Sequence, residues 1–143
     1  MIAINIKNES DYASNTLKRT YPDGLDVEVF TSQALYEADK FSSYSFMREH
    51  VTPYIHGHLF NQFPCGNFKR DQLVYKINYS NYRWTLDYRE DLVFLNTIYD
   101  NLDDNCSWQE VIELILKYPH LKNINQHIKL NEGTEISLNK FKI

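Results

Sequence analysis

Residues 21–30 read YPDGLDVEVF, and this stretch decides what kind of fold the chain can form. Pro, Asp and Gly at 22–24 are a turn signal, and after them aliphatic residues alternate with the acidic Asp26 and Glu28. Successive side chains of a strand point to opposite faces, so we expect a strand over 26–30 with both carboxylates on one face, roughly 7 Å apart. Two interpretations stay open: a polar binding site, or an edge strand with one solvated face.

The composition is that of one globular domain. The chain has 143 residues, of which 43% are hydrophobic and 15% aromatic, and a net charge of −4. This is enough to bury a core, so we expect residues 1–143 to form a single domain. The absence of a Lys/Arg cluster argues against a nucleic-acid partner, and no apolar run reaches the roughly 18 residues of a membrane span. Cys65 and Cys106 lie far apart, which is typical of a reduced, cytoplasmic protein.

Further strands are expected where apolar and polar residues alternate, at 72–78 (QLVYKIN) and at 83–87 (RWTLD). Residues 2–6 (IAINI) fit either a short buried strand or the end of a helix. The polar residues 8–20 are expected to form a loop because they are rich in Asn, Ser and Thr. The tail, 128–143, is expected to be an edge strand or a flexible end.

Two helices are expected in the first half of the chain. Thr31 or Ser32 provides an N-cap, and apolar residues at helical spacing follow over 34–41. The second helix covers part of 46–55 and is expected to kink or end just before Pro53, because proline cannot donate a backbone hydrogen bond.

Two more helices are expected in the second half. Asp87 is expected to cap the first of them with Glu90 as its reciprocal partner, and Ser107 with Glu110 caps the second, which Pro119 closes. The expected buried stripe of the first consists of Tyr88, Leu92, Leu95, Tyr99 and Leu102. That of the second consists of Trp108, Val111, Ile112 and Ile115.

Three stretches taken together resemble one family. They are SDYASNTLKRTYPDGLDVEVF at 10–30, REHVTPYI at 48–55 and RWTLDYREDLVFLNTIYDNL at 83–102. In this order they resemble the C-terminal half of cytidylyltransferases of the spore-coat polysaccharide biosynthesis type, relatives of CMP-KDO synthetase and acylneuraminate cytidylyltransferase. The resemblance implies an α/β fold, a partial nucleotidyltransferase-like (Rossmann-like) sandwich with a short mixed sheet and flanking helices.

The resemblance also implies an activity. The family joins a sugar or sugar acid to CMP, using CTP and Mg²⁺ and releasing pyrophosphate. Its N-terminal half carries the basic nucleotide-binding loop, for which this sequence has no counterpart. Arg89 stands where the family usually has Pro, at a first-turn position where the loss of Pro costs little. We therefore expect the sugar-binding and oligomerising half, inactive towards CTP by itself, with a homo-oligomer or a separate N-terminal half as partner.

Asp87 is the candidate metal ligand, because the matching Asp of the family helps to bind Mg²⁺, which prefers hard oxygen ligands. Its alternative role is the plain N-cap described above. By the same resemblance, Asp26 and Glu28 face the sugar and accept hydrogen bonds from its hydroxyl groups. Arg19 and Arg83 are candidates for binding a carboxylate or phosphate, because guanidinium binds both in a bidentate manner. The alternative for the arginines is an ordinary ion pair.

The motif at 48–50, Arg48, Glu49 and His50, is expected to belong to the substrate pocket or to a subunit contact. His56 and His58 are too few for a zinc site, because no Cys or carboxylate follows at ligand spacing.

Two further hypotheses stay open beside that of an enzyme part. The chain is a non-catalytic interaction module that forms a homo-oligomer, or it is a piece of a longer enzyme. The open edge of a half-sheet favours pairing with another chain.

Overall fold

A computed structural model describes residues 1–58 and 63–129. These residues form two compact units, and each is described by itself. The first unit contains residues 1–21, 26–58 and 63–78, and the second contains 22–25 and 79–129. The expected tail strand lies almost wholly outside the described residues. The single-domain organisation stays a prediction.

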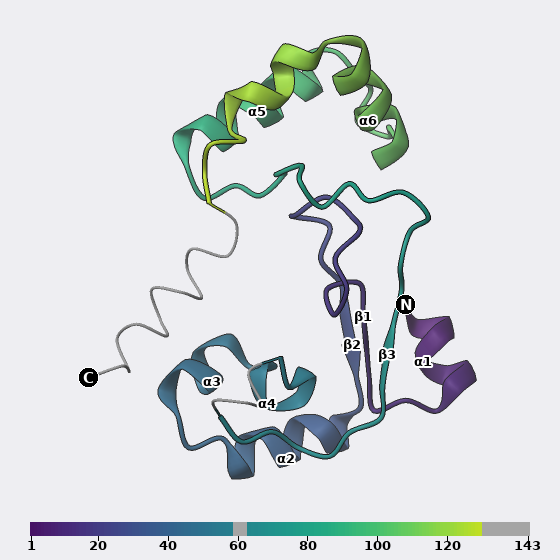
Figure 1. Ribbon diagram of the computed structural model, residues 1–143, viewed down its shortest axis with the longest axis vertical. Coiled ribbons are helices and arrows are strands. Elements are labelled where there is room, and N and C mark those ends of the chain that lie inside the picture. The colour runs from purple at the N-terminus through teal and green to yellow at the C-terminus, as the bar shows by residue number, and fades with distance from the viewer. Residues whose placement is uncertain (59–62, 130–143) are drawn as a thin grey trace. The chain divides into compact units, whose positions relative to one another are not determined.

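A three-stranded mixed sheet forms the centre of the first unit (Figure 1). Its strands are β1 (Tyr12–Ser14), β2 (Glu28–Phe30) and β3 (Arg70–Gln72), in the order β2-β1-β3. β1 runs antiparallel to β2 and parallel to β3. The helix α1 (Ile2–Asn8) contacts all three strands. The expected short mixed sheet with flanking helices is thus confirmed.

Three further helices belong to this unit: α2 (Ser32–Phe41), α3 (Ser45–His50) and α4 (Pro53–His56). Thr31 caps α2 as expected, since its Oγ1 accepts a 3.1 Å hydrogen bond from the backbone N–H of Ala34. The expected break before Pro53 is also confirmed, because α3 ends at His50 and Pro53 opens α4.

The core of the first unit joins the sheet to α2 and α4. Its fully buried members are Tyr12 of β1, Ala34 and Ala38 of α2, and Ile55 of α4. The two alanines lie on the buried face of α2, and partly buried side chains pack against the cluster: Leu17, Phe30, Tyr54 and Phe68.

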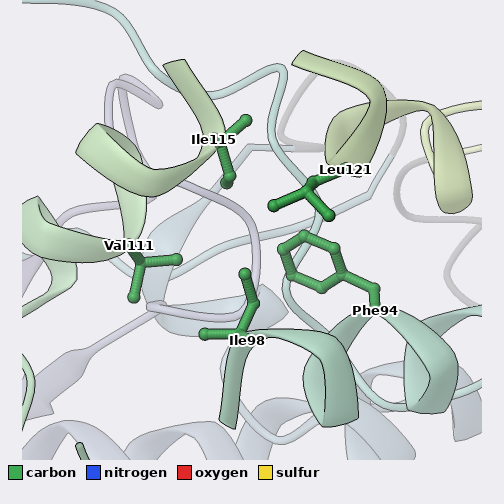
Figure 2. Packing of buried hydrophobic residues seen from close by; sticks show 5 residues of the cluster. All are labelled: Phe94, Ile98, Val111, Ile115 and Leu121. Atoms are coloured by element: carbon green, nitrogen blue, oxygen red, sulfur yellow. The ribbon is translucent and has the colours of Figure 1, made fainter. Parts of the chain in front are cut away.

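The second unit is helical and has its own core. It contains α5 (Arg89–Tyr99), α6 (Trp108–Lys117) and the 3₁₀ helix η1 (Pro119–Ile124). The buried side chains at the centre of this core are Phe94, Ile98, Val111, Ile115 and Leu121 (Figure 2). The short segment 22–25 joins this unit through a bridge between Asp23 and Arg83. None of the described helices is long and apolar enough to cross a bilayer.

The two main helices of this unit differ in whether their N-terminal caps agree with expectation. The expected capping box of α6 is confirmed: Ser107 Oγ accepts from the backbone N–H of Glu110 at 3.3 Å, and the Glu110 carboxylate accepts from the backbone N–H of Ser107 at 2.7 Å. The cap of α5 differs from expectation, because the N-cap is Tyr88 and the acidic partner at the third helical position is Asp91.

The buried face of α5 is rotated from the expected stripe. Phe94, Ile98 and Asp91 are buried, whereas three of the expected stripe residues are exposed: Tyr88, Leu92 and Tyr99. The expected stripe was therefore wrong at these positions. A buried carboxylate at Asp91 defines the inner face of the helix, and an apolar pattern cannot reveal it. In α6 the stripe is confirmed for Val111, Ile112 and Ile115.

The expected strands were placed less well than the helices. Strand β2 begins only at Glu28, so Asp26 precedes it, and β3 lies at Arg70–Gln72 rather than at 72–78. Within 83–87 only Arg83 forms a bridge. The central strand β1 lies inside 8–20, which was expected to be a loop. Strands of three residues are too short to show a periodic pattern.

Candidate functional site

A carboxylate held by two hydroxyl groups marks the candidate site of the first unit. Glu28 lies at the start of β2 and is exposed to solvent. Its Oε1 accepts a hydrogen bond from the hydroxyl of Tyr12, and its Oε2 accepts one from Thr52 Oγ1 at 3.1 Å. Both donors are buried. An ionised carboxylate with fixed orientation and solvent access is suited to accept hydrogen bonds from a polar ligand.

Tyr12 is kept neutral by its surroundings. Burial and the hydrogen bond to Glu28 raise the pKa of Tyr12 far above its ordinary value. Its hydroxyl therefore remains a donor to Glu28 at any physiological pH. Sequence analysis did not single out Tyr12 or Thr52, although both lie in the motif stretches 10–30 and 48–55, because neither occurs in a recognisable catalytic or ligand-binding spacing.

Arg19 and Asp26, two of the expected substrate residues, bind each other. Arg19 Nη1 and Nη2 donate to the two oxygens of Asp26 at 3.0 and 2.7 Å. The pair is bidentate and partly exposed, which matches the ion-pair alternative for Arg19. Asp26 and Glu28 thus have separate partners, and the structure does not join them into one carboxylate pair.

Two histidines lie near the other polar groups of this unit. The rings of His56 and His58 are 4.7 Å apart between centroids, and His56 packs against Tyr12 at 6.4 Å. The backbone N–H of His58 donates to His56 Nδ1 at 3.1 Å, so neutral His56 carries its proton on Nε2. Burial, followed by the charges of His58 and Arg70, lowers the pKa of His56 to about 4.

The charges of two candidate residues, Arg19 and Glu28, affect the pKa of His58. Burial and then the charge of Arg19 lower its pKa, while Glu28 acts in the opposite direction. The ring of His56 packs against Tyr12, and the charge of Glu28 acts on His58, so both rings belong to the surroundings of this hydrogen-bonded group. Sequence reasoning considered His56 and His58 only as zinc ligands. Among the described residues, no three His, Cys, Asp or Glu side chains are placed to hold a metal ion together.

The 48–50 motif divides its side chains between different surroundings. Arg48 donates to the backbone oxygen of Asp39 at 2.8 Å and to its carboxylate at 2.5 Å, and both side chains are exposed. Glu49 is exposed, whereas His50 is partly buried. The Nε2 atom of His50 is buried without a hydrogen-bond partner among the residues that the structure describes.

The second unit contains a different polar cluster, centred on Arg83. Its guanidinium is 6% exposed and donates from Nε and Nη2 to the two oxygens of Asp91, at 2.9 and 2.8 Å. Nη2 also donates to Asp87 at 2.9 Å, and Nη1 lies 4.0 Å from Asp23. The guanidinium is therefore surrounded by carboxylates, which favours the ion-pair alternative for Arg83 over a role in binding substrate.

Asp91 is the most heavily bonded side chain of this cluster. Besides Arg83 it accepts from Asn125 Nδ2 at 2.9 Å and from the backbone N–H groups of Asp87 and Tyr88, at 3.0 and 3.1 Å. Burial alone would raise the pKa of Asp91, but these hydrogen bonds, led by that of Arg83, hold it well below its usual range. Asn125 also donates to the backbone oxygen of Arg83 at 3.0 Å.

Asp87, the expected Mg²⁺ ligand, lies at the solvent side of the cluster. Its side chain is 63% exposed, and one of its oxygens is held by Arg83. Mg²⁺ in nucleotide enzymes is bound by one or two carboxylates together with phosphate oxygens and water. A single exposed carboxylate fits the smallest such set, in which phosphate oxygens of a bound nucleotide and water molecules supply the remaining ligands. It does not form a metal site by itself.

Comparison with known proteins indicates the kind of fold that contains these clusters. No family model matches the chain. A solved structure of a cytidylyltransferase from Leptospira borgpetersenii serovar Hardjo-bovis superposes with a TM-score of 0.77 at 28% sequence identity, over 90% of this chain. The fold is cytidylyltransferase-like.

The cytidylyltransferase-like chain is shorter than the proteins that it matches. It covers 52% of the Leptospira cytidylyltransferase chain. An uncharacterized protein of Methanocaldococcus jannaschii is 31% identical over 137 residues, which is 92% of this chain and 51% of that protein. The chain therefore spans about half the length of both relatives.

Proposed function

We propose that the chain is the sugar-binding and oligomerising half of a cytidylyltransferase that makes nucleotide-sugars for surface polysaccharides. The observation that carries the proposal is the exposed Glu28 carboxylate, fixed by the hydroxyl groups of Tyr12 and Thr52 within a cytidylyltransferase-like fold. Fixed carboxylates are suited to bind sugar hydroxyls because they only accept hydrogen bonds and a sugar offers many donors.

The nucleotide side of the reaction is proposed from Asp87 and its partner Arg83. Asp87 would hold Mg²⁺ together with the phosphates of CTP, and the ion would neutralise charge on them. Arg83 would set the position of Asp87 through their 2.9 Å hydrogen bond. Because the sequence lacks a basic loop for the triphosphate, we propose that the chain needs a further N-terminal half for turnover.

We propose the type of cytidylyltransferase from the three motifs at 10–30, 48–55 and 83–102. They resemble the spore-coat polysaccharide type and the relatives that act on KDO and acylneuraminate. The proposed substrate is accordingly a sugar or a sugar acid.

A binding experiment tests the sugar role. The chain is titrated by calorimetry with candidate sugars and sugar acids, and separately with CTP and Mg²⁺. We expect sugar binding that Glu28→Gln weakens at least tenfold, as expected for a hydrogen bond to a charged group. Glu37→Gln, a change of a partly buried carboxylate on α2, serves as the control. Sugar binding that is equal in both variants would refute the assignment to Glu28.

The same titration tests the nucleotide role. We expect weak or no binding of CTP with Mg²⁺, and no release of pyrophosphate when a sugar acid is added. Binding of CTP that Asp87→Ala abolishes would support the metal role of Asp87. Clear pyrophosphate release by the chain alone would contradict the need for a further half.

The alternative is a non-catalytic module that forms a homo-oligomer. It is favoured by the sheet order, because among the described strands β2 and β3 each pair only with β1, and outer strands can pair with another chain. Light scattering at high protein concentration distinguishes the states. A dimer without affinity for sugar or CTP would favour this alternative.

A further inference from the structure

One residue between α3 and α4 has a backbone conformation that its side chain disfavours. Val51 has φ 65° and ψ −54°, and the backbone N–H of Thr52 donates to the backbone oxygen of His50 at 2.7 Å. These angles and this bond define a γ-turn of the rarer, strained kind. A positive φ is a true outlier for a β-branched residue, and such strain persists only where the surrounding structure imposes it.

Packing of the valine side chain does not account for the strain. Val51 is 45% exposed, so its side chain contributes little to the core. It touches the rim of a cavity of about 180 Å³ between α2 and α3, whose apolar lining includes Leu35, Ala38 and Met47.

The position of Thr52 does account for the turn. The turn reverses the chain direction directly before Thr52, which is 7% exposed and donates from Oγ1 to Glu28 at 3.1 Å. On its other side, the Thr52 backbone oxygen accepts from the N–H groups of Ile55 and His56, at 2.9 and 2.8 Å. Thr52 is thus held between the γ-turn and the first turn of α4.

We propose that the strained turn at Val51 is a positioning element, which holds the Thr52 hydroxyl on Glu28 so that this carboxylate presents its free lone pairs to two adjacent hydroxyl groups of a ligand. The ligand class rests on the proposed sugar role. Within the described part of the chain, each oxygen of Glu28 accepts one hydrogen bond, one from Tyr12 and one from Thr52. A carboxylate has about four acceptor sites, so one remains on each oxygen.

A pair of adjacent hydroxyls is the donor set that matches two neighbouring acceptor sites on one carboxylate. A single hydroxyl uses only one of them. Thr52 and Tyr12 leave the carboxylate little freedom to rotate, so loss of either donor should weaken recognition of the pair more than recognition of a single hydroxyl.

The first experiment needs no sugar. It distinguishes the effect of the Val51 backbone conformation from the effect of the Val51 side chain. Val51→Gly relaxes the positive φ, whereas Val51→Ala removes the side chain and keeps a Cβ. We follow the Thr52 hydroxyl proton and the ¹³C resonance of the Glu28 carboxylate by NMR. We expect faster hydroxyl exchange and a shifted carboxylate resonance in Val51→Gly, with an unchanged or higher urea midpoint. Val51→Ala should resemble the wild type in both resonances.

The second experiment tests the ligand class with simple probes, cis-1,2-cyclohexanediol and cyclohexanol. We expect the diol, and not the alcohol, to shift the Glu28 resonance of the wild type. Val51→Gly and Thr52→Val should lower the affinity for the diol roughly tenfold, the effect of one hydrogen bond to a charged group. Thr52→Ser, which keeps the hydroxyl, should restore much of it.

The outcomes separate this inference from the proposed function. Unchanged Thr52 and Glu28 resonances in Val51→Gly would overturn the positioning role, whatever sugar the chain binds. Equal shifts with diol and alcohol, or none with either, would overturn the ligand class. A diol response that depends on Val51, in a chain that binds no sugar in calorimetry, would uphold the positioning element and refute the sugar role.

Discussion

Removing the charge of Asp91 should destabilise the second unit more than any change at a neighbouring surface carboxylate. Asp91 is completely buried and accepts five hydrogen bonds: two from Arg83, one from Asn125 and two from backbone N–H groups. In Asp91→Asn one carboxylate oxygen becomes an NH₂ group, whose hydrogens face groups that are themselves donors, and the guanidinium of Arg83 stays buried.

The expected loss of stability follows from the uncompensated charge that the substitution leaves in the interior. Breaking a buried ion pair by removing one partner costs about 3–5 kcal/mol, because the remaining charge is uncompensated. Arg83 keeps its contact with the exposed Asp87, which places the expected cost near the lower end, at about 3 kcal/mol. The matched control, Glu90→Gln, alters an exposed carboxylate in the same helical turn and should cost less than about 1 kcal/mol.

Urea unfolding followed by tryptophan fluorescence is the assay. Both tryptophans of the chain, Trp84 and Trp108, lie in the second unit and therefore report on it. The double variant with Arg83→Met should lose less than the sum of the two single changes, because the interaction can be lost only once. A loss for Asp91→Asn equal to that of Glu90→Gln, or additive losses in the double variant, would refute the reasoning.

The same carboxylate predicts the direction of an acid transition. The pKa of Asp91 is lowered in the folded chain, so the unfolded chain binds more protons in the range between the folded and unfolded values. The stabilisation is complete above the unfolded pKa of about 3.9 and is lost as the pH falls towards the folded value. Wild type and Asp91→Asn should thus converge in stability below about pH 4. A constant difference down to pH 2 would contradict this.

Three further predictions concern packing, protonation and backbone conformation. Ile115→Ala should lower the free energy of unfolding by about 2–5 kcal/mol, and the exposed neighbour Leu116→Ala by less than about 0.5 kcal/mol, in the same urea assay. His56 should stay neutral down to about pH 4, so its ring resonances in NMR should not titrate between pH 8 and 5; a midpoint near 6.5 would contradict its burial. Folding should then lose stability as the pH falls from about 6.5, since only the unfolded ring gains a proton there. Gly24→Ala should destabilise the second unit because φ is +104° and a Cβ would lie 2.6 Å from the backbone carbon of Trp84; an unchanged urea midpoint would refute this.

The sequence predicted the helices because their signals are local. Thr31, Pro53 and the pair Ser107 and Glu110 act within one turn of the backbone, and each cap or break lies where it was expected. The strands could not be placed as well, because three residues carry no period. Tyr12 to Ser14 became the central strand through pairing with segments far along the chain, which no local pattern encodes.

The candidate site was predicted in part for the same reason. Glu28 stood out because it alternates with aliphatic residues in a stretch with a turn signal. Its partners, Tyr12 and Thr52, come from other elements, and only the tertiary structure joins them. Asp91 escaped notice because a carboxylate in the first turn of a helix usually interacts with the macrodipole at the surface. Its burial depends on Arg83 and Asn125, which bind it from outside the helix.

The small bridge between Asp23 and Arg83 has a consequence for dividing the chain into pieces. Residues 22–25 belong to the second unit, although the residues before and after them in the sequence belong to the first unit. A fragment that starts at residue 79 would lack the backbone partner of Arg83, because Trp84 N–H donates to the Asp23 oxygen at 2.7 Å and Asp23 N–H donates to Tyr82 at 2.9 Å. Two fragments cut after residue 78 would each hold part of one folding unit, so reconstitution from both would recover what neither forms alone.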